Sequence, residues 1–527
     1  KEDILVNVFS QNHANATIFE VAVVAAILVL GVFNDTPVLN IPASASIFLF
    51  FTLLMMIASA VYSWLKGWAI SIFILCFMLF NLISYGNFEY YRNDIYGLVY
   101  DVPRQPYPPP EVNKESAEIQ EKIKHDHEHG MQILENWKQK IVGDQSDKKP
   151  PIVFISTTGG GLRSALWTIR SIQYTDELLT GKLLNHTHMI SGSSGGMIGA
   201  AFIRELYLKS QKNDSIDLYD DYWMNRMGQD ILNPIALNLV IRDMFFKFRK
   251  VQIEGHAYTL DRGYAFEKQL NDNTNNILDK KLMDYAEVEY NAKIPLMIFT
   301  PTVVNDGRKL IISSQPVSHL ANNYTSGTIN NRSINEYVNF MKLFEPMGAR
   351  NVKFTSVLRI NATFPYILPT ASLPTDPLVK IMDSGVRDNF GLVNIYKYIY
   401  TYRKWLEKNV SRIIILELRD KFKEQETRLK PTKTLLENMS SPLGSFYMNW
   451  TNIQTFEQDQ LVQYAESWMS TPVDVMSMQL HNEGQHKISL SWHLTKKEKK
   501  QIENAVNHPK NQTAIYELMK KIYGFDQ

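Results

Sequence analysis

Long apolar runs, interrupted by very few charges, dominate the first 86 residues. Residues 18–86 contain three charged side chains: Glu20, Asp35 and Lys66. The runs Ile47–Leu65 and Gly67–Gly86 carry no charge and no polar face. About 20 residues at 1.5 Å each cross the ~30 Å hydrocarbon core of a bilayer. The pattern therefore predicts two membrane-spanning helices.

A shorter apolar run, Val21–Phe33, predicts a third span that is tilted or partly interfacial. A cleaved signal peptide fits less well, because the start of the chain is acidic and two longer runs follow. The first residue is Lys1, which is compatible with further protein before it. We expect residues 1–87 to form an N-terminal α-helical transmembrane region of about three helices.

Positive charges next to the spans give no consistent orientation. Lys66 favours a cytoplasmic loop between the second and third spans, whereas Arg92 and Arg104 favour the opposite side for the following chain. The sequence alone therefore leaves the topology open.

Residues 88–150 are predicted to form a proline-rich linker and an amphipathic helix. The run QPYPPP (105–110) favours polyproline II and makes a stiff spacer. In 113–141, apolar residues recur at helical spacing: Ile119, Ile123, Ile133, Leu134, Trp137 and Ile141. His125 and His129 would share a helix face, but no third ligand stands at a useful spacing, so we interpret this face as solvated rather than metal-binding.

From Pro151 onward, short apolar runs rich in β-branched residues alternate with helix-like segments. The predicted strands are PIVFIS (151–156), THMIS (187–191), PLMIFTPTVV (295–304), KLIISS (309–314), LVKIMD (378–383) and RIIILEL (412–418). This alternation predicts an α/β fold whose mainly parallel central sheet is covered on both faces. Segments 209–290 and 420–480 lack the pattern, and we expect them to be mostly helical or irregular.

Composition excludes several classes of function. The chain has 527 residues, which predicts more than one unit. Its net charge is +1 without a long basic block, so nucleic acid is not an expected partner. The lone cysteine, Cys76, excludes a disulfide framework and a cysteine-based zinc site.

Two glycine-containing motifs follow the first two strands of this domain. Gly159, Gly160 and Gly161 form a loop after the first strand, and Ser194 is the central residue of a G-x-S-x-G motif after the second. About 33 residues separate them, near the length of one strand–helix–strand unit, so we expect the two loops on adjacent strands. Ser193, beside the nucleophile position, is interpreted as a turn residue.

Glycine amides at the start of a helix suit either an oxyanion or a phosphate. Neither a Walker loop nor a dinucleotide fingerprint surrounds residues 159–161, which favours the oxyanion. A third feature, Asp383, directly follows the strand LVKIMD. If that strand lies in the same parallel sheet, its carboxylate reaches the edge that holds the other two loops.

Together the three motifs resemble those of the patatin-like phospholipase family. That family carries a Gly-Gly-Gly-x-Arg oxyanion loop, a G-x-S-x-G nucleophile and an Asp-Gly-[Gly/Ala] motif that completes a Ser–Asp dyad. The matching residues are Gly159, Gly160, Gly161 and Arg163, then Gly192, Ser194 and Gly196, then Asp383 and Gly385. Weaker similarity lies in 261–267, 360–369 and 388–392, so the resemblance covers about 151–420.

The resemblance implies a patatin-like three-layer catalytic domain over 151–527, with a core at about 151–420 and a helical C-terminal extension. Ser194 would be the nucleophile, Asp383 the general base, and the 159–161 loop with Arg163 the oxyanion hole. Gly192 and Gly196 would shape the elbow. The residues that would support the aspartate motif are Gly385, Asp388 and Asn389, with a structural role for Asp388. No metal or cofactor is implied.

Three residues depart from the family pattern. Thr158 stands where the family usually has an acidic residue or glycine, Ser164 replaces the glycine after Arg163, and Ser384 replaces the middle glycine of the aspartate motif. These positions shape the loops without supplying reacting groups, so they bear on rate and substrate more than on the reaction class.

The resemblance also implies a substrate and a location. A catalytic domain tethered to a bilayer favours phospholipid, lysophospholipid or another membrane ester, with an acyl channel beside Ser194 lined from residues 244–248. We expect an integral protein of a bacterial inner membrane, and family analogy favours the cytoplasmic side for the catalytic domain. A homo-oligomer or a complex with another membrane protein stays open.

Three alternatives remain at this point. A Ser–Asp–His triad would use one of three histidines as its base: His486, His493 or His508. A catalytically silent scaffold or lipid sensor would keep the fold without turnover. A nucleotide-binding membrane protein would use the 159–161 loop for phosphate and need neither Ser194 nor Asp383.

Overall fold

The computed structural model describes residues 11–12, 15–23, 25, 42–86, 92–109, 111–112, 117–145, 147–213, 215–243, 250–321, 333–364, 366–422, 453–465, 467–481 and 487–524. The chain divides into two compact units. The first comprises Lys1–Asp94, Asp230–Gln269 and Tyr366–Pro369, and the second comprises Ile95–Gln229, Leu270–Pro365 and Thr370–Gln527. A segment from the middle of the chain thus belongs with the apolar N-terminal region, which the sequence pattern does not predict.

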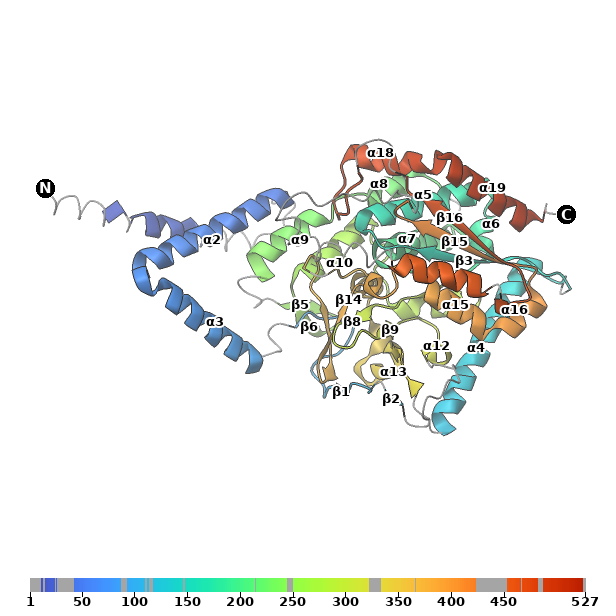
Figure 1. The fold of residues 1–527 in the computed structure, drawn as a ribbon, viewed down its shortest axis with the longest axis horizontal. Coiled ribbons are helices and arrows are strands. Elements are labelled where there is room, and N and C mark those ends of the chain that lie inside the picture. Colours follow the sequence, from blue (N-terminus) through green and yellow to red (C-terminus); the bar gives the residue numbers. More distant parts are fainter. Residues whose placement is uncertain are drawn as a thin grey trace. The chain divides into compact units, whose positions relative to one another are not determined.

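Two long apolar helices form much of the first unit (Figure 1). Helix α2 (Ala43–Leu65) and helix α3 (Ala69–Gly86) are joined by the 3-10 turn η2 (Lys66–Trp68). Among the described residues, α2 is the one helix whose length and apolar composition suffice to cross a membrane, and the apolar stretch Ala69–Leu79 of α3 is shorter. Most of the run Val21–Phe33 lies outside the described residues.

Helix α2 has a partner within its own unit. Helix α9 (Leu232–Asn238) packs along it, and Leu53, Leu237 and Val240 are buried together. The Ala43 amide, at the start of α2, donates a hydrogen bond of 2.7 Å to Asn233 Oδ1. The rest of the segment contains a π-helical turn, Leu239–Asp243, and a hairpin of β5 (Lys250–Ile253) and β6 (His256–Thr259).

The second unit is a mixed α/β structure around a five-stranded parallel sheet (Figure 1). Its strand order is β16 (Val473–Gln479), β15 (Ile413–Arg419), β3 (Ile152–Thr157), β4 (Thr187–Gly192) and β7 (Leu296–Ile298). Every neighbouring pair is parallel. The prediction of a mainly parallel central sheet is confirmed, although the edge strand β16 lies in a segment expected to be helical or irregular.

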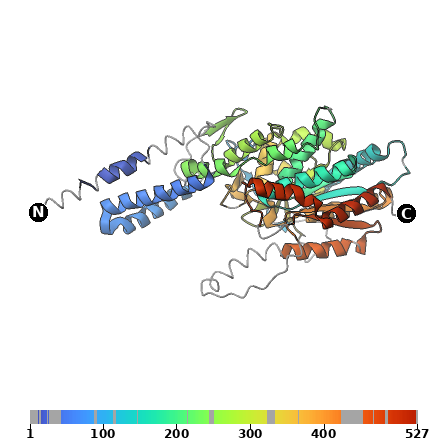
Figure 2. The ribbon, with the colours of Figure 1, turned by 90° about the horizontal axis from the view of Figure 1, so that it is seen from above.

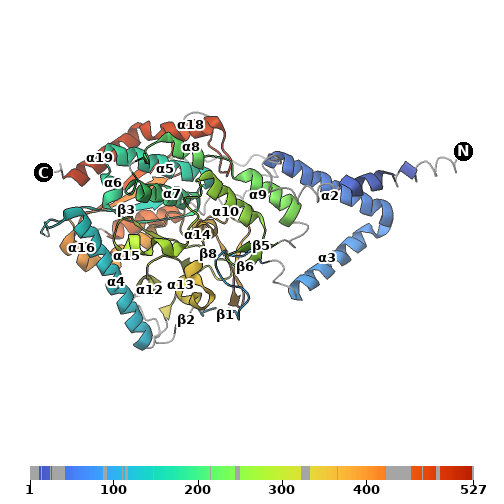
Figure 3. The ribbon, with the colours of Figure 1, turned by 180° about the vertical axis from the view of Figure 1, so that it is seen from behind.

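Helices cover both faces of this sheet, as its buried apolar strands require. Figure 3 shows α5 (Gly161–Leu178), α18 (Lys496–Asn504) and α19 (Pro509–Tyr523) on one side of β3. The same figure shows α15 (Leu392–Thr401) and α4 (Ala117–Val142) on the other side. Figure 2 looks onto the first of these sides, where the red helices lie in front.

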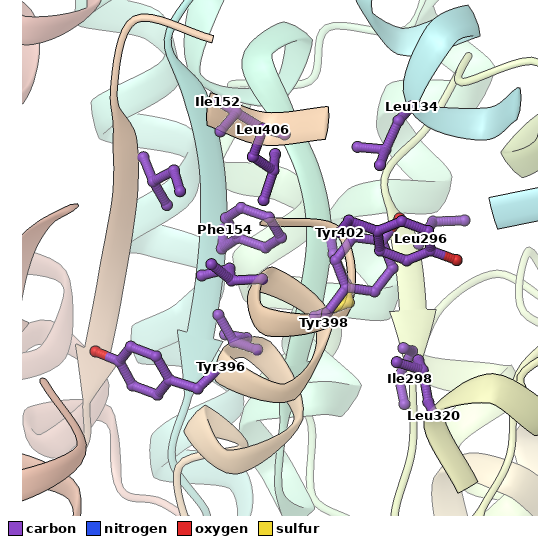
Figure 4. Close-up of a cluster of buried hydrophobic side chains, with 14 of the residues drawn as sticks. Leu134, Ile152, Phe154, Leu296, Ile298, Leu320, Tyr396, Tyr398, Tyr402 and Leu406 are labelled. Carbon is purple, nitrogen blue, oxygen red and sulfur yellow. The ribbon is translucent and has the colours of Figure 1, made fainter. Parts of the chain in front are cut away.

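The core on the α4 side is shown in Figure 4. Ile152 and Phe154 of β3 pack there against Leu134 of α4 and Tyr398 of α15, all of them buried. Strand alternation sends Val153 and Ile155 to the opposite face. The amphipathic helix predicted in 113–141 corresponds to α4, and Ile133, Leu134 and Trp137 of its apolar stripe are buried in this core.

A second five-stranded sheet lies in the same unit. Its order is β11 (Tyr337–Asn339), β9 (Lys309–Ile311), β8 (Thr302–Val303), β14 (Val379–Met382) and β12 (Ala371–Leu373). Only β11 and β9 pair in parallel. Placing LVKIMD in the parallel sheet was therefore wrong, because β14 pairs antiparallel with both neighbours. The run PLMIFTPTVV is divided between the two sheets as β7 and β8.

Shorter elements complete the described chain. The helices are α6 (Lys182–His186), α7 (Ser194–Ser210), α8 (Asp221–Met227), α10 (Arg262–Asn273), α11 (Ala286–Tyr290), α12 (Ser318–Ala321), α13 (Phe340–Leu343), α14 (Phe354–Asn361) and α16 (Arg403–Asn409). The strands are β1 (Gln105–Pro106), β2 (Glu111–Val112), β10 (Ser333–Ile334) and β13 (Thr375–Asp376). The expected helical C-terminal extension corresponds to α18 and α19.

Candidate active site

Ser194 stands at the turn between β4 and α7. Its φ is +49°, a left-handed conformation that costs a residue with a Cβ about 1–2 kcal/mol. A Cβ on Gly192 would lie 2.2 Å from the Thr157 carbonyl oxygen, and one on Gly196 would lie 2.4 Å from the Thr158 carbonyl oxygen. Both outer glycines of the motif are thus needed for the elbow to lie this close to β3.

Ser193 is engaged elsewhere. Its hydroxyl donates to the carbonyl oxygen of Asn389 at 2.8 Å and lies 3.0 Å from Asn389 Oδ1. These contacts fit the turn role predicted for Ser193 and leave Ser194 as the elbow hydroxyl.

Asp383 lies directly after β14, and the Ser194 side chain lies close enough to its carboxylate to lower its pKa. Asp383 Oδ1 also accepts the Gly385 amide at 2.7 Å, and the Asp383 backbone carbonyl accepts the Thr302 hydroxyl at 3.0 Å. Asp383 is 4% exposed and Ser194 is 7% exposed. The structure therefore brings together the two side chains that the sequence selected, although they come from different sheets.

The environment of Asp383 favours a protonatable carboxyl group. Burial raises its pKa from 3.8 to about 6, while the hydrogen bonds from Gly385 and Ser194 act in the opposite direction. Among the described residues, no charged side chain contributes to this pKa shift. A carboxylate with a pKa near 6 can accept a hydroxyl proton and return it close to neutral pH.

The glycine loop lies beside the elbow, as its position on the adjacent strand predicts. A Cβ on Gly159 would lie 3.2 Å from Ser194 Cβ. The Gly159 amide is already engaged, donating to the Asn389 carbonyl at 3.3 Å and to Asn389 Oδ1 at 3.1 Å. In the described part of the chain, the amides of Gly160 and Gly161 have no acceptor. These two amides are therefore the donors of this loop that remain available to an oxyanion.

Arg163, two residues after the glycine loop, is bound to two buried partners. Its guanidinium forms a buried ion pair with Asp420 and donates to the Ile488 carbonyl at 2.9 Å. Thr158 Oγ1 donates to Asp420 Oδ1 at 3.1 Å and accepts the Asp420 amide at 2.8 Å. Arg163 is therefore bound to Asp420, and Thr158 fits the same buried network despite its departure from the family pattern.

The other two departures also have partners. The Ser164 hydroxyl donates to the Thr158 carbonyl, and the Ser384 hydroxyl donates to the Asn361 carbonyl at 3.2 Å. Each hydroxyl is thus satisfied by a backbone carbonyl next to the loops that it shapes.

Asp388 and Asn389 occupy different parts of the loop after Asp383. Asp388 is 1% exposed, accepts the Gly391 amide at 2.8 Å and lies 3.8 Å from Lys309 Nζ. Asn389 joins the glycine loop to the elbow through the contacts with Gly159 and Ser193 described above. Asp420 was missed from the sequence, because no local motif marks a partner 257 residues away from Arg163.

Histidines do not contact the pair in the described structure. The partners of Ser194 and Asp383 there include no histidine. His508 caps α19, with Nδ1 accepting the Lys510 amide at 3.3 Å, and its ring stacks on His481. His493 has its amide bonded to Ser491 Oγ at 3.0 Å, whereas His486 lies outside the described residues.

The described residues contain no group of three His, Cys, Asp or Glu side chains placed to hold a metal ion. A cavity of about 300 Å³, lined by residues including Ile123, Tyr337 and Leu343, does not include Ser194 or Asp383. The residues expected to line an acyl channel, 244–248, fall outside the described ranges.

Comparisons with known proteins give distant similarities. No protein-family model matches the chain, and no curated protein matches it. Human GIVD cytosolic phospholipase A2, in complex with methyl gamma-linolenyl fluorophosphonate and terbium chloride, is 13% identical, with a TM-score of 0.37 over 80% of this chain. This chain covers 66% of the length of that phospholipase. VipD from Legionella pneumophila is 9% identical, with a TM-score of 0.27 over 70% of this chain and 67% of its own. At such values the activity must be argued from the site itself.

Proposed function

We propose that this chain is a membrane-anchored serine acyl hydrolase of the phospholipase A or lysophospholipase type. The observation that carries the proposal is the position of Ser194, held in a left-handed elbow, beside the buried Asp383 carboxylate. Strained residues with perturbed titratable partners mark sites of chemistry more often than sites of packing.

The chemistry follows from these two side chains. Asp383 takes the Ser194 proton while Oγ forms a bond to the acyl carbonyl carbon, and the resulting oxyanion accepts the Gly160 and Gly161 amides. The ester C–O bond then breaks, and the leaving alcohol takes the proton from Asp383. Water repeats the sequence on the acyl-serine, with Asp383 again as base, and releases the fatty acid.

The substrate class follows from the apolar N-terminal helices. Helix α2 has the length and composition of a membrane span, and large apolar side chains on its outer surface, such as Phe48 and Met55, are more than 70% exposed. A catalytic unit on the same chain would act on esters presented by a bilayer.

Fluorophosphonate labelling of the full chain in native membranes tests the proposal. Wild type and Ser193→Ala are expected to label, and Ser194→Ala is expected to lose labelling together with fatty-acid release from phospholipid vesicles. A wild-type chain that neither labels nor releases fatty acid would instead support a silent scaffold or lipid sensor. Full activity in Asp383→Asn with loss in His493→Ala would replace the dyad by a triad.

A further inference from the structure

A helix from the C-terminal third of the chain, residues 453–465, buries polar rather than apolar side chains at its first turns. Gln454 and Gln458, one turn apart, are 6% and 3% exposed. Ile453 and Phe456, between and beside them, are 51% and 68% exposed. A surface helix ordinarily shows the reverse pattern, so apolar burial does not explain how this end of the helix is held.

Hydrogen bonds hold this end of the helix. Those of the Gln454 and Gln458 side chains reach the loop that follows Asp383. Gln454 Oε1 accepts the Asn389 amide at 2.9 Å. Gln454 Nε2 donates to the carbonyl oxygens of Gly385 at 3.2 Å and Val386 at 3.1 Å. Gln458 Nε2 donates to Asp388 Oδ1 at 3.3 Å. One buried amide therefore joins both ends of residues 385–389.

We infer that Gln454 is a positioning residue for the Ser194–Asp383 pair, an inference that rests on the proposed function. Its side chain binds the carbonyl of Gly385, the residue whose amide binds Asp383, and it binds the amide of Asn389, whose other groups bind both the glycine loop and Ser193. The base and the oxyanion loop thus share one distant support.

The bond from Gln454 to Gly385 also connects Gln454 to Asp383, the proposed proton acceptor. Among the described residues, the groups that act on the Asp383 carboxylate are the Gly385 amide and the Ser194 hydroxyl, and no charged side chain does so. Both hydrogen bonds favour the ionised carboxylate and lower its pKa. Loosening the Gly385 peptide weakens one of them, which raises the pKa of Asp383 and moves the acid limb of the pH–rate profile to higher pH.

Gln454→Met tests this inference, because methionine keeps the volume and helix propensity of glutamine but neither donates nor accepts these bonds. Gln460→Met, on the exposed face of the same helix, is the matched control. Vesicle hydrolysis is measured across pH, with Ser194→Ala as blank. We expect kcat of Gln454→Met to fall at least about tenfold with KM within about twofold, and its acid limb to rise by about half a pH unit.

A second variant and a second measurement keep the inference open to refutation if methionine impairs folding. Gln454→Glu retains the acceptor for Asn389 but not the donor to Gly385, so an intermediate kcat is expected. Hydrogen exchange of the Asn389 amide should accelerate in Gln454→Met and stay protected in Gln460→Met. Wild-type kcat and pH profile in both Gln454 variants overturn the positioning role alone, whereas absence of Ser194-dependent hydrolysis in wild type overturns the proposed function and this inference together.

Discussion

At the scale of single residues, side chains of the same type in the candidate site differ in the groups that they contact. Ser193 and Ser194 are neighbours, yet the Ser193 hydroxyl binds Asn389, whereas Ser194 lies beside the Asp383 carboxylate and lowers its pKa. Asp383 is held by the Gly385 amide and a hydroxyl, while Asp420 is paired with Arg163. Burial without a charged partner raises the pKa of Asp383, which suits the base role proposed for it, whereas Asp420 is bound in an ion pair.

The pH dependence of hydrolysis is expected to follow Asp383. Only the ionised carboxylate can accept the Ser194 proton, and its pKa is raised to about 6, so kcat/KM should rise through an acid limb near that pH. Rates of wild type between pH 4.5 and 8 measure this limb. A limb near 4 would show that Asp383 is not desolvated during catalysis.

The variant Asp383→Asn tests whether this carboxylate is the base. We expect its rate of hydrolysis to fall by about 10²-fold or more. Because burial raises the folded-state pKa from 3.8 to about 6, the folded chain binds more protons in this window, and stability falls as pH rises through it. Removing the carboxylate should therefore raise the free energy of unfolding at pH 7, by on the order of 2 kcal/mol. If Asp383→Asn were inactive but less stable than wild type, burial of the charged Asp383 carboxylate would not be what limits stability at pH 7.

At the scale of elements, close approach of two helices places the proposed nucleophile, Ser194, beside the proposed oxyanion donors. Helices α5 and α7 begin at Gly161 and Ser194. A Cβ on Gly195 would lie 1.9 Å from the Gly161 carbonyl oxygen, and one on Gly199 would lie 2.3 Å from the Ala165 carbonyl oxygen. The small residues after the elbow are therefore contact positions between two helices.

Gly199→Ala should force these helices apart. The backbone oxygen of Ala165 cannot move without moving α5, so we expect a loss of about 2 kcal/mol in unfolding free energy and a fall in kcat. Gly228→Ala is the control, because its nearest contact is 3.1 Å and a smaller change is expected. Thermal unfolding and vesicle hydrolysis measure both effects. Equal behaviour of the two variants would argue against helix contact as the positioning device.

Local pattern predicted the elements and their loops but not which sheet each strand joins. PIVFIS and RIIILEL are continuous apolar runs, and β3 and β15 are buried along their whole length, as parallel strands usually are. In β14, by contrast, Lys380 interrupts the run and burial alternates, which is typical of an antiparallel strand. That signal was present in the sequence. The partners Asp420 and Gln454 left no such signal, because their contacts depend on chain segments that the fold alone brings together.

At the scale of the whole molecule, the apolar helices and the proposed catalytic residues belong to different compact units. The first unit holds α2, α3 and the segment Asp230–Gln269, and the second holds Ser194 and Asp383. The sequence predicted an N-terminal apolar region, but not that a mid-chain helix, α9, packs on α2. A later segment of the chain is thus tied to the helix proposed to span the membrane.

The single cysteine tests whether the apolar helices lie in a bilayer. Cys76 is exposed and stands within α3, so no other thiol competes for labelling. In native membranes, a membrane-impermeant maleimide should leave Cys76 unmodified, and detergent should render it reactive. Cys76→Ala with Lys212→Cys, at an exposed position of the catalytic unit, is the control on permeabilised membranes. Rapid labelling of Cys76 before detergent would exclude burial of α3 in lipid.

The left-handed backbone at Ser194 bears on which residue evolution is expected to keep at this position. Glycine at this position would avoid the cost of a Cβ at φ +49°, by about 1 kcal/mol, and would fit the elbow equally well. A lineage that had lost hydrolysis would gain stability by that single replacement. Among sequences that share this elbow, the residue at position 194 should therefore separate hydrolytic chains, which need the serine hydroxyl, from silent ones, which do not.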